Sequence, residues 1–406
     1  MTIYVSHPTK DLAGTVSKSL AGRKIVLAVT GSIAAVETVK LARELIRRGA
    51  EVQAVMSPAA QEILGPYALQ YATGREVITK ITGDVEHVAY CGQRKEAYDL
   101  LLIAPCTANT IGKMAMGIDD TTVTTFATTA IGSQVPVLVV PAMHGSMLEH
   151  PIVQQNIEKL KGIGIQFVAP VTAEGAAKFP GNDAIVLSVE RALIKSSLRG
   201  KRVLITSGPT LEEIDPIRIL TSRSTGRMGE ELALEAFRRG AAVTVVHRGR
   251  LGMPGIAELR SESSADMGRA VLGELSRGYD IYISAAAISD FTVDRTARKI
   301  RSAGPVTLRL KPAAKLLDRV RHDFPALFVV AFKAETAGGQ ELLDKAERRM
   351  DESGANVIVA NTFGGPRDSE VNDVYILSPG SKTVHSSGPK GRVAAAILDV
   401  VAEHFA

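Results

Sequence analysis

The stretches SLAGRKIVLAVTGS at residues 19–32 and SLRGKRVLITSGPT at 197–210 decide the fold. Both have a basic lead-in, a short β-rich apolar run and then a turn of Thr, Ser and Gly. Each is followed by a helix-like pattern ending in Arg-Arg-Gly and by a second apolar run, VKLARELIRRGAEVQAVMS and GEELALEAFRRGAAVTVVHRG. The repeated pattern predicts that each half of the chain opens with a strand, a helix and a second strand.

Further short apolar runs predict the remaining strands. They lie at residues 99–104, 135–140, 165–169, 280–285, 326–331 and 356–360. Continuous apolar runs of this kind are typical of parallel strands that are covered on both faces. Because they alternate with helical segments, we predict two doubly wound α/β domains with parallel sheets, in which ligands bind beyond the carboxyl ends of the strands.

The length of 406 residues also favours two domains, because a single core stops growing at roughly 250–300 residues. We expect an N-terminal arm at residues 1–21 that packs on a neighbouring subunit, a first domain at 22–196 and a second domain at 197–406. The boundary is placed where the helix-like VERALIKSSL ends in Arg199-Gly200, just before the second strand-turn motif.

Composition narrows the class of protein. Apolar residues make up 45% and charged residues 22%, as in globular proteins, and no apolar run approaches the roughly 20 residues that span a membrane. The N-terminus lacks a secretory pattern, and only Cys91 and Cys106 are present, so we expect a cytoplasmic protein and assign the cysteines no role. A net charge of +5 spread along the chain suits anionic small molecules. With 4% aromatic residues and no zinc-finger or RNP-like motif, nucleic-acid binding is not expected.

Small and hydroxyl-bearing residues follow the first strand. In the turn Thr30 to Ala35, residues Gly31, Ser32 and Ala34 would let backbone N–H groups approach a phosphate at a helix N-terminus. The turn is not GxGxxG, and an ordinary tight turn would have the same residues. Polar residues also crowd the segments 103–130 and 141–147, which follow two later strands. Polar groups therefore converge on one edge of the predicted sheet.

With these motifs, residues 22–190 resemble the flavin-dependent cysteine decarboxylases, which have a GSIAA turn, a PATAN segment and a PAMN-like loop followed by Met. The resemblance implies that flavin oxidises a cysteine thiol and that the product loses CO₂. It implies FMN as the cofactor, bound by Gly31, Ser32, Ala34, Ser57 and Thr107. It also places Asn109, His144 and Met147 at the substrate.

His87, in DVEHVAY, matches the active-site histidine of that family, and a histidine can transfer protons near neutral pH. The alternative is that His87 is an ordinary histidine on the surface of a helix. Two positions depart from the family: His144 replaces an asparagine that contacts the substrate carboxylate, and the stretch 172–183 lacks the flap cysteine of bacterial members. Lys178 is the one proton donor of note in that stretch. Either an acid other than cysteine completes the reaction, with Lys178 as the candidate, or the reaction stops after oxidative decarboxylation. The PAMH and EGxAK forms resemble archaeal versions of the bifunctional decarboxylase and ligase.

The second half has a matching series of motifs. SGPT at 207–210, DPIR ending at Arg218 and STGRMG at 224–229 each suit phosphate binding. In this order they resemble the TAGPT, DPVR and NxSSGKMG motifs of the phosphopantothenate–cysteine ligases. The resemblance continues through AAAISDF at 285–291, Lys299-Ile300, AFKAET at 331–336, Ala360-Asn361 and Asn372-Asp373.

The ligase resemblance implies that a nucleotide, CTP rather than ATP, activates a carboxylate before cysteine attacks it. It implies a nucleotide site formed by Gly208, Gly226, Asp290, Lys299, Phe332 and Lys333. Lys299 would stabilise charge, although its alternative is a solvated lysine, and Asp290 would hold Mg²⁺, although its alternative is a capping residue. Arg218 and Ser222 would bind substrate, with Ser222 in place of a family asparagine.

Together the resemblances imply an enzyme of coenzyme A biosynthesis. It would join cysteine to 4′-phosphopantothenate and decarboxylate 4′-phosphopantothenoylcysteine to 4′-phosphopantetheine, as a homo-oligomer with flavin sites between subunits. One alternative is a ligase whose flavin domain is structural or impaired. A nicotinamide-dependent reductase would require GxGxxG and an acidic residue after the second strand, which neither half has. A flavodoxin-like electron carrier would leave the second half unexplained.

Overall fold

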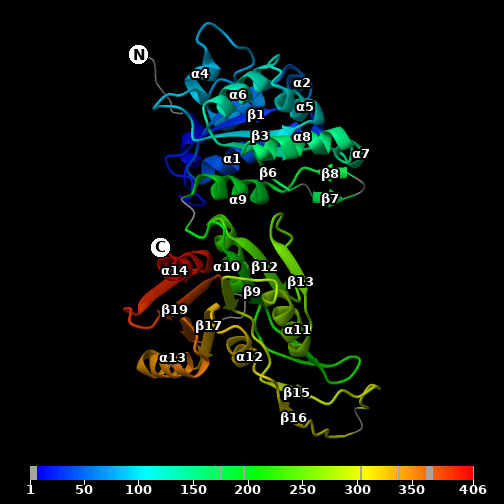
Figure 1. Ribbon diagram of the computed structural model, residues 1–406, viewed down its shortest axis with the longest axis vertical. Coiled ribbons are helices and arrows are strands. Elements are labelled where there is room, and N and C mark those ends of the chain that lie inside the picture. Colours follow the sequence, from blue (N-terminus) through cyan, green and yellow to red (C-terminus); the bar gives the residue numbers. More distant parts are fainter. Residues whose placement is uncertain are drawn as a thin grey trace. The chain divides into compact units, whose positions relative to one another are not determined.

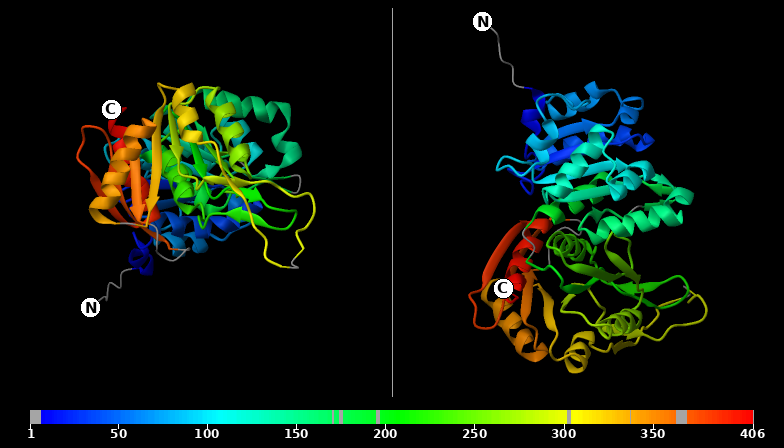
Figure 2. Two further views of the ribbon diagram at one scale, coloured as in Figure 1. Left: turned by 90° about the horizontal axis from the view of Figure 1, so that it is seen from below. Right: turned by 45° about the horizontal axis from the view of Figure 1, so that its top comes forward.

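The computed structural model describes residues 7–169, 171–173, 176–194, 197–301, 304–336, 338–362 and 369–405, with the backbone alone described at 171–173 and 176–178. The chain forms two compact units, Met1–Ile194 and Lys195–Ala406. Each unit has helices packed on a central sheet (Figure 1 and Figure 2). Within the described residues, no helix is both long enough and apolar enough to cross a membrane.

The first unit contains a five-stranded parallel sheet in the order β2-β1-β3-β4-β6. Its strands are β1 (Lys24–Val29), β2 (Glu51–Met56), β3 (Leu100–Cys106), β4 (Val137–Pro141) and β6 (Gln166–Phe167). This is the flavodoxin-like order, in which the chain reverses direction across the sheet between β1 and β3. The predicted strands at 99–104, 135–140 and 165–169 are confirmed.

Successive side chains of the strands point to opposite faces, and each face has its own core. Ile25 and Leu27 of β1 pack with α1, α3 and α9, whereas Val26 and Ala28 pack with α4, α5, α6 and α8. The helices are η2 (Ile33–Glu37), α1 (Thr38–Arg47), α2 (Pro58–Gln61), α3 (Pro66–Thr73), α4 (Glu86–Cys91), α5 (Ala108–Met116), α6 (Thr122–Gly132), α7 (Gly145–Leu148), α8 (Pro151–Gly162) and α9 (Asn182–Leu193).

Two smaller features complete the first unit. A three-stranded sheet, β5-β8-β7, is formed by β5 (Met143–His144), β7 (Val171–Ala173) and β8 (Ala176–Lys178). The 3₁₀ helix η1 (Pro8–Leu12) packs on α1 and α3 of the same unit, and the hydroxyl of the buried Thr9 donates to the Tyr71 carbonyl at 3.1 Å. Residues 8–12 of the predicted arm therefore contact their own domain.

The second unit contains an eight-stranded sheet in the order β13-β12-β9-β14-β17-β18-β19-β20. The strands are β9 (Arg202–Ser207), β12 (Ala242–His247), β13 (Ala257–Arg260), β14 (Ile281–Ser284), β17 (Phe328–Glu335), β18 (Val357–Thr362), β19 (Val371–Leu377) and β20 (Val384–Pro389). The six strands from β13 to β18 are parallel, and the chain reverses direction across the sheet between β9 and β14. Five of these strands were predicted, whereas β13 was not. The antiparallel β19 and β20 were not predicted.

The sheet of the second unit is also covered on both faces. Helices α11, α12 and α13 pack on one face, while α10 and α14 contact each other and β9, β12, β19 or β20. The helices are α10 (Arg227–Arg238), α11 (Ser264–Leu275), α12 (Leu316–Asp323), α13 (Gly339–Ser353) and α14 (Lys390–Glu403). Two antiparallel ribbons, unpredicted from the sequence, extend this unit: β10 (Leu211–Glu213) with β11 (Ile219–Thr221), and β15 (Phe291–Val293) with β16 (Leu310–Pro312) (Figure 1).

Candidate active sites

Thr30 joins the carboxyl ends of β1 and β3. Its hydroxyl donates to the Pro105 carbonyl at 2.8 Å and accepts from the Thr107 backbone N–H at 3.1 Å. Because these strands flank the reversal point of the sheet, the two predicted turns meet where doubly wound domains bind ligands. The structure thus brings the segment of Gly31 and Ser32 beside that of Thr107.

Gly31 has no room for a side chain. A Cβ at this position would lie 2.5 Å from the Cβ of Ala59 and 3.1 Å from its carbonyl carbon. The turn after β1 therefore packs directly against the start of α2. Ser32 then caps η2, since its hydroxyl accepts from the Ala34 backbone N–H at 3.4 Å.

Two other predicted residues are helix caps at the same edge of the sheet. Ser57 follows β2 and accepts from the Ala60 backbone N–H, and Thr107 follows β3 and accepts from the Thr110 backbone N–H, both at 3.3 Å. Asn109 is exposed in the first turn of α5. Helix N-termini present free N–H donors and partial positive charge to anions. All five residues predicted to bind FMN, together with Asn109, thus lie at this edge.

His87 lies on α4, which packs on α6. Its side chain is half-buried, and its Nδ1 is buried without a hydrogen-bond partner among the described residues. Val85, immediately before the helix, has a φ of 54°, a strained value for a β-branched residue. In the described part of the chain, no hydrogen bond joins His87 to the residues at the sheet edge.

His144 and Met147 lie in a separate loop beyond β4. His144 is exposed on β5 and pairs with Ala176 of β8, and Met147 on α7 is 46% exposed. The β5–β8 pairing places the predicted flap beside this loop. Lys178 is the last residue of β8, but its side chain lies outside the described part of the structure.

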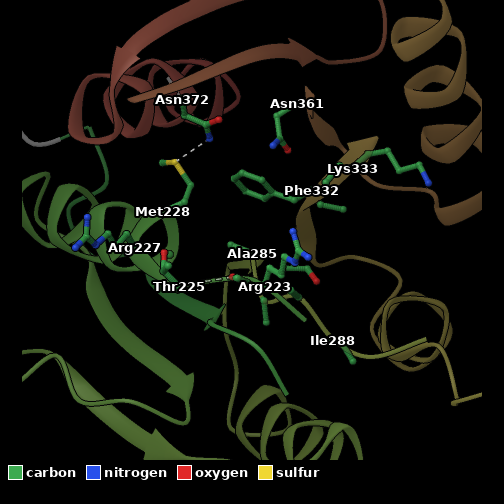
Figure 3. Close-up of a pocket in the computed structure, with 18 of the residues that line it drawn as sticks. Arg223, Thr225, Arg227, Met228, Ala285, Ile288, Phe332, Lys333, Asn361 and Asn372 are labelled. Carbon is green, nitrogen blue, oxygen red and sulfur yellow. Dashed lines mark hydrogen bonds between the residues drawn. The ribbon is translucent and has the colours of Figure 1, made fainter. Parts of the chain in front are cut away.

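The second unit has a cavity of about 940 Å³ at the carboxyl ends of its central strands (Figure 3). Its walls are the N-terminal turn of α10, the segment after β14, the start of α12, and the ends of β17 and β18. Four of the residues predicted to bind nucleotide line this cavity: Gly226, Asp290, Phe332 and Lys333.

Close packing of glycines brings α10 to the cavity. The Ser207 hydroxyl at the end of β9 donates to the Gly226 carbonyl at 2.8 Å. A Cβ on Gly229 would lie 2.5 Å from the Ser207 Oγ, and Gly226 has a φ of 83° as the N-cap residue. Only glycine allows the helix to start this close to the strand. The helix N-terminus then faces a cavity where an anion would be stabilised.

The charged side chains around the cavity differ in their surroundings. Lys333 pairs with Glu335 at 2.7 Å, and hydrogen bonds from Lys333 and Lys345 lower the pKa of Glu335. Asp290 is exposed at the cavity wall. Among the described residues, no three His, Cys, Asp or Glu side chains form a metal-binding group.

Four predicted residues lie outside the cavity lining, namely Gly208, Arg218, Ser222 and Lys299. Lys299 is exposed, and Ser222 has a buried hydroxyl without a partner among the described residues. Arg218 pairs with the buried Asp215 at 2.5 Å and donates to the Ile300 carbonyl at 3.0 Å. The structure therefore gives Arg218 a contact within the chain, which the sequence had not indicated.

The cavity also contains cations that sequence reasoning missed. Arg223, Lys315 and Lys390 line it. Figure 3 also shows Asn372 beside Met228, whose Sδ is 3.8 Å from the Asn372 Nδ2. Lys315 precedes α12 and follows no buried strand. Reading only the residues after strands therefore could not find it.

The fold and the two sites define a two-domain α/β protein, with a flavodoxin-like first unit and a second unit whose cavity is lined by cationic side chains. Residues 13–193 match the family described as Flavoprotein, and residues 198–405 match the DNA/pantothenate metabolism flavoprotein C-terminal domain. The chain is 48% identical over 379 residues to the "Coenzyme A biosynthesis bifunctional protein CoaBC" of Thermococcus kodakarensis, covering 91% of this chain and 93% of that one. It is 37% identical to the protein of the same name from Methanocaldococcus jannaschii, covering 99% and 98%.

Among solved structures, a crystal structure of the C-terminal domain of such a protein is 29% identical, covers 52% of this chain and 97% of that chain, and has a TM-score of 0.44. The chain belongs to the family of bifunctional coenzyme A biosynthesis proteins, with a flavoprotein domain followed by a ligase domain.

Proposed function

We propose that this chain performs two consecutive steps of coenzyme A biosynthesis in the cytoplasm. The second unit joins cysteine to 4′-phosphopantothenate with CTP, and the first unit decarboxylates the product to 4′-phosphopantetheine with FMN. The observation that carries the proposal is the 940 Å³ cavity of the second unit. The N-terminus of α10 and the cationic side chains of Arg223 and Lys315 lie around it, at the ends of parallel strands. Such a site suits a nucleoside triphosphate.

Ligation begins with the carboxylate oxygen of 4′-phosphopantothenate attacking the α-phosphorus of the nucleotide, so that pyrophosphate leaves. The cysteine amine then attacks the acyl carbon, the nucleoside monophosphate leaves, and the amine loses a proton to solvent. Gly226 and Phe332 would contact the nucleotide, Asp290 would hold Mg²⁺ together with the phosphates, and the cationic side chains would stabilise the leaving charge.

The residues at the edge of the first sheet fit a flavin phosphate. Gly31 keeps the turn free of a side chain, and the helix N-termini capped by Ser57 and Thr107 point their donors to the same edge. When bound, FMN would accept two electrons from the cysteine thiol and return them after CO₂ leaves. His87 would take up the thiol proton, His144 would donate a hydrogen bond to the substrate carboxylate, and Lys178 would supply the final proton.

The assembly we propose is a homo-oligomer with flavin sites at subunit interfaces. The apolar side chain of Ile33, which directly follows the Gly31–Ser32 turn and is 77% exposed, supports an additional contact near the flavin edge. The mass of the protein in solution, measured by light scattering with and without FMN, tests this proposal. A monomeric protein that binds FMN fully would contradict it.

Replacing Gly31 by alanine should weaken flavin binding. The new Cβ would lie 2.5 Å from the Ala59 Cβ, and relieving such overpacking costs about 1–3 kcal/mol. The turn would have to move away from α2, so we expect a flavin affinity reduced by about 10-fold or more. Titration of the apoprotein with FMN, followed by flavin fluorescence, measures the change.

Gly162→Ala is the matched control, because nothing lies within 4 Å of its added Cβ. It should bind flavin as the unmodified protein does. Equal affinity of the Gly31→Ala variant would show that the turn after β1 does not hold the phosphate.

The proposed function is tested with purified protein, 4′-phosphopantothenate, cysteine, Mg²⁺ and either CTP or ATP. Pyrophosphate, CO₂ and the thiol product are followed by mass spectrometry. Formation of 4′-phosphopantetheine with CO₂ supports both steps, and faster pyrophosphate release with CTP supports the nucleotide preference. Accumulation of 4′-phosphopantothenoylcysteine would show that only the ligase is active. If no pyrophosphate forms with either nucleotide, the proposed ligation is refuted.

A further inference from the structure

We infer that Asp215 is a positioning residue for ligation, which holds the backbone of the segment that carries Lys299. This inference rests on the proposed function, because it assigns Lys299 to the activation of the carboxylate by nucleotide. Asp215 is not among the residues that line the 940 Å³ cavity. Its effect on the reaction would pass entirely through the residues that it binds.

The Asp215 carboxylate accepts four hydrogen bonds. One oxygen accepts the backbone N–H groups of Ile217 and Arg218, both at 2.8 Å. The other accepts the Ile300 N–H at 3.1 Å and the Arg218 guanidinium at 2.5 Å. The Asp215 side chain is 0% exposed. A buried carboxylate with this many donors is fixed in one orientation.

Arg218 completes a clamp on the same residue. Its guanidinium donates to the Ile300 carbonyl at 3.0 Å while it pairs with Asp215. Both backbone polar groups of Ile300 are therefore held by the Asp215–Arg218 pair. Ile300 directly follows Lys299 in the chain.

The other end of the segment is also tied to the Asp215 turn. The Thr296 backbone N–H and hydroxyl donate to the Ile214 carbonyl at 2.9 and 3.2 Å. Residues 296–300 are therefore attached at both ends to residues 214–218, whereas the Lys299 side chain between them is exposed. The clamp restrains the backbone and leaves the amine free to approach a substrate.

The Asp215 carboxylate is ionised under assay conditions. Burial alone would raise the pKa of Asp215, but the three backbone N–H donors and Arg218 outweigh it and hold the pKa well below the usual range. The stabilisation from the ionised carboxylate is thus fully present above pH 3.8, the ordinary aspartate value, and is lost only as the pH falls below it. In measurements near neutral pH, the Asp215 carboxylate is therefore in its charged form.

The test is a double-mutant cycle of Asp215→Asn and Lys299→Ala, read as pyrophosphate release. Asparagine keeps the shape and loses the charge and one acceptor. We expect kcat to fall about 10- to 100-fold, since a small displacement of a reacting group has effects of this size, with the nucleotide KM changed less than about threefold. In the double variant, kcat should be no lower than in Lys299→Ala alone, because both changes remove the same contribution. If Lys299→Ala has no measurable rate, Lys299→Arg replaces it in the cycle.

Hydrogen exchange gives a second readout that does not depend on activity. In Asp215→Asn, the Ile300 and Thr296 amides should exchange faster, while the amides of β14 keep their protection. Asp294→Asn is the matched control. The Asp294 side chain is 74% exposed and pairs with Lys311 of β16 at 2.6 Å. Loss of this exposed ion pair should change neither the rate of pyrophosphate release nor the exchange of the Ile300 and Thr296 amides. If Asp215→Asn does not fold, Arg218→Lys should show the same pattern with a smaller effect.

The outcomes separate the two proposals. No pyrophosphate release by the unmodified protein would refute the proposed function itself. Ligation by the unmodified protein with a normal rate in Asp215→Asn, or with multiplicative losses in the double variant, would overturn the positioning role alone. Decarboxylation of supplied 4′-phosphopantothenoylcysteine should be unchanged in every variant of this set, because the changes lie in the other unit.

Discussion

Replacing His87 by glutamine should slow decarboxylation of supplied 4′-phosphopantothenoylcysteine by about 10²- to 10⁴-fold, the usual contribution of a general acid or base. His87 is half-buried, and its Nδ1 is buried without a partner among the described residues. Glutamine retains a similar size and hydrogen bonding but cannot transfer a proton. CO₂ release from substrate in excess of enzyme measures the effect.

His150→Gln is the control for this change. His150 caps α8 and accepts from the Ile152 backbone N–H at 3.2 Å, so its side chain has a structural contact with its own helix. Flavin content should be equal in the two variants and in the unmodified protein. A His87→Gln variant that releases CO₂ at the normal rate would exclude His87 as the base, although the flavin site could still be correct.

Replacing Lys299 by alanine should reduce the rate of pyrophosphate release by about 10²- to 10³-fold, which is typical when one charge-stabilising donor is removed. The expected loss is in kcat, because the developing charge of the leaving group is what the amine would stabilise. Single-turnover pyrophosphate release, measured at saturating nucleotide, isolates this step.

Lys315→Ala provides the informative comparison, because Lys315 lines the cavity whereas Lys299 does not. A lysine that only binds the triphosphate should mainly raise the nucleotide KM, by about 10-fold for a loss of 1.4 kcal/mol. Lys311→Ala, which removes an exposed partner of Asp294, should leave both constants unchanged. A normal kcat in Lys299→Ala with a large loss in Lys315→Ala would transfer the charge-stabilising role to the cavity lysine.

The parallel strands other than β13 were predictable because burial on both faces leaves a continuous apolar run in the sequence. The run at 326–331 became the core of β17, and 356–360 became the core of β18. The strands β19 and β20 are less apolar, with exposed residues such as Val371 and Val384. Their pairing depends on contact with β18 and with each other, which no local pattern reveals.

Part of each site could be predicted for the same reason. Thr107 and Phe332 lie in or directly after buried strands, so their convergence follows from the topology of a parallel sheet. Lys315 and Arg223 come from segments that approach the cavity from other elements. Their contribution depends on how α12 and α10 pack, which is a long-range property of the chain.

The sequence by itself determined the repeated βαβ pattern, the α/β class and the family, because apolar periodicity and ordered motifs are local properties of the chain. Tertiary structure decided what Arg218 contacts: a residue that suited a phosphate by its type is paired with Asp215 and Ile300. It also decided that Gly31 and Gly229 must lack side chains, since the atoms that would clash belong to Ala59 and Ser207. The physical reason is that hydrogen bonds and steric contacts depend on distances between segments, which only the folded chain fixes.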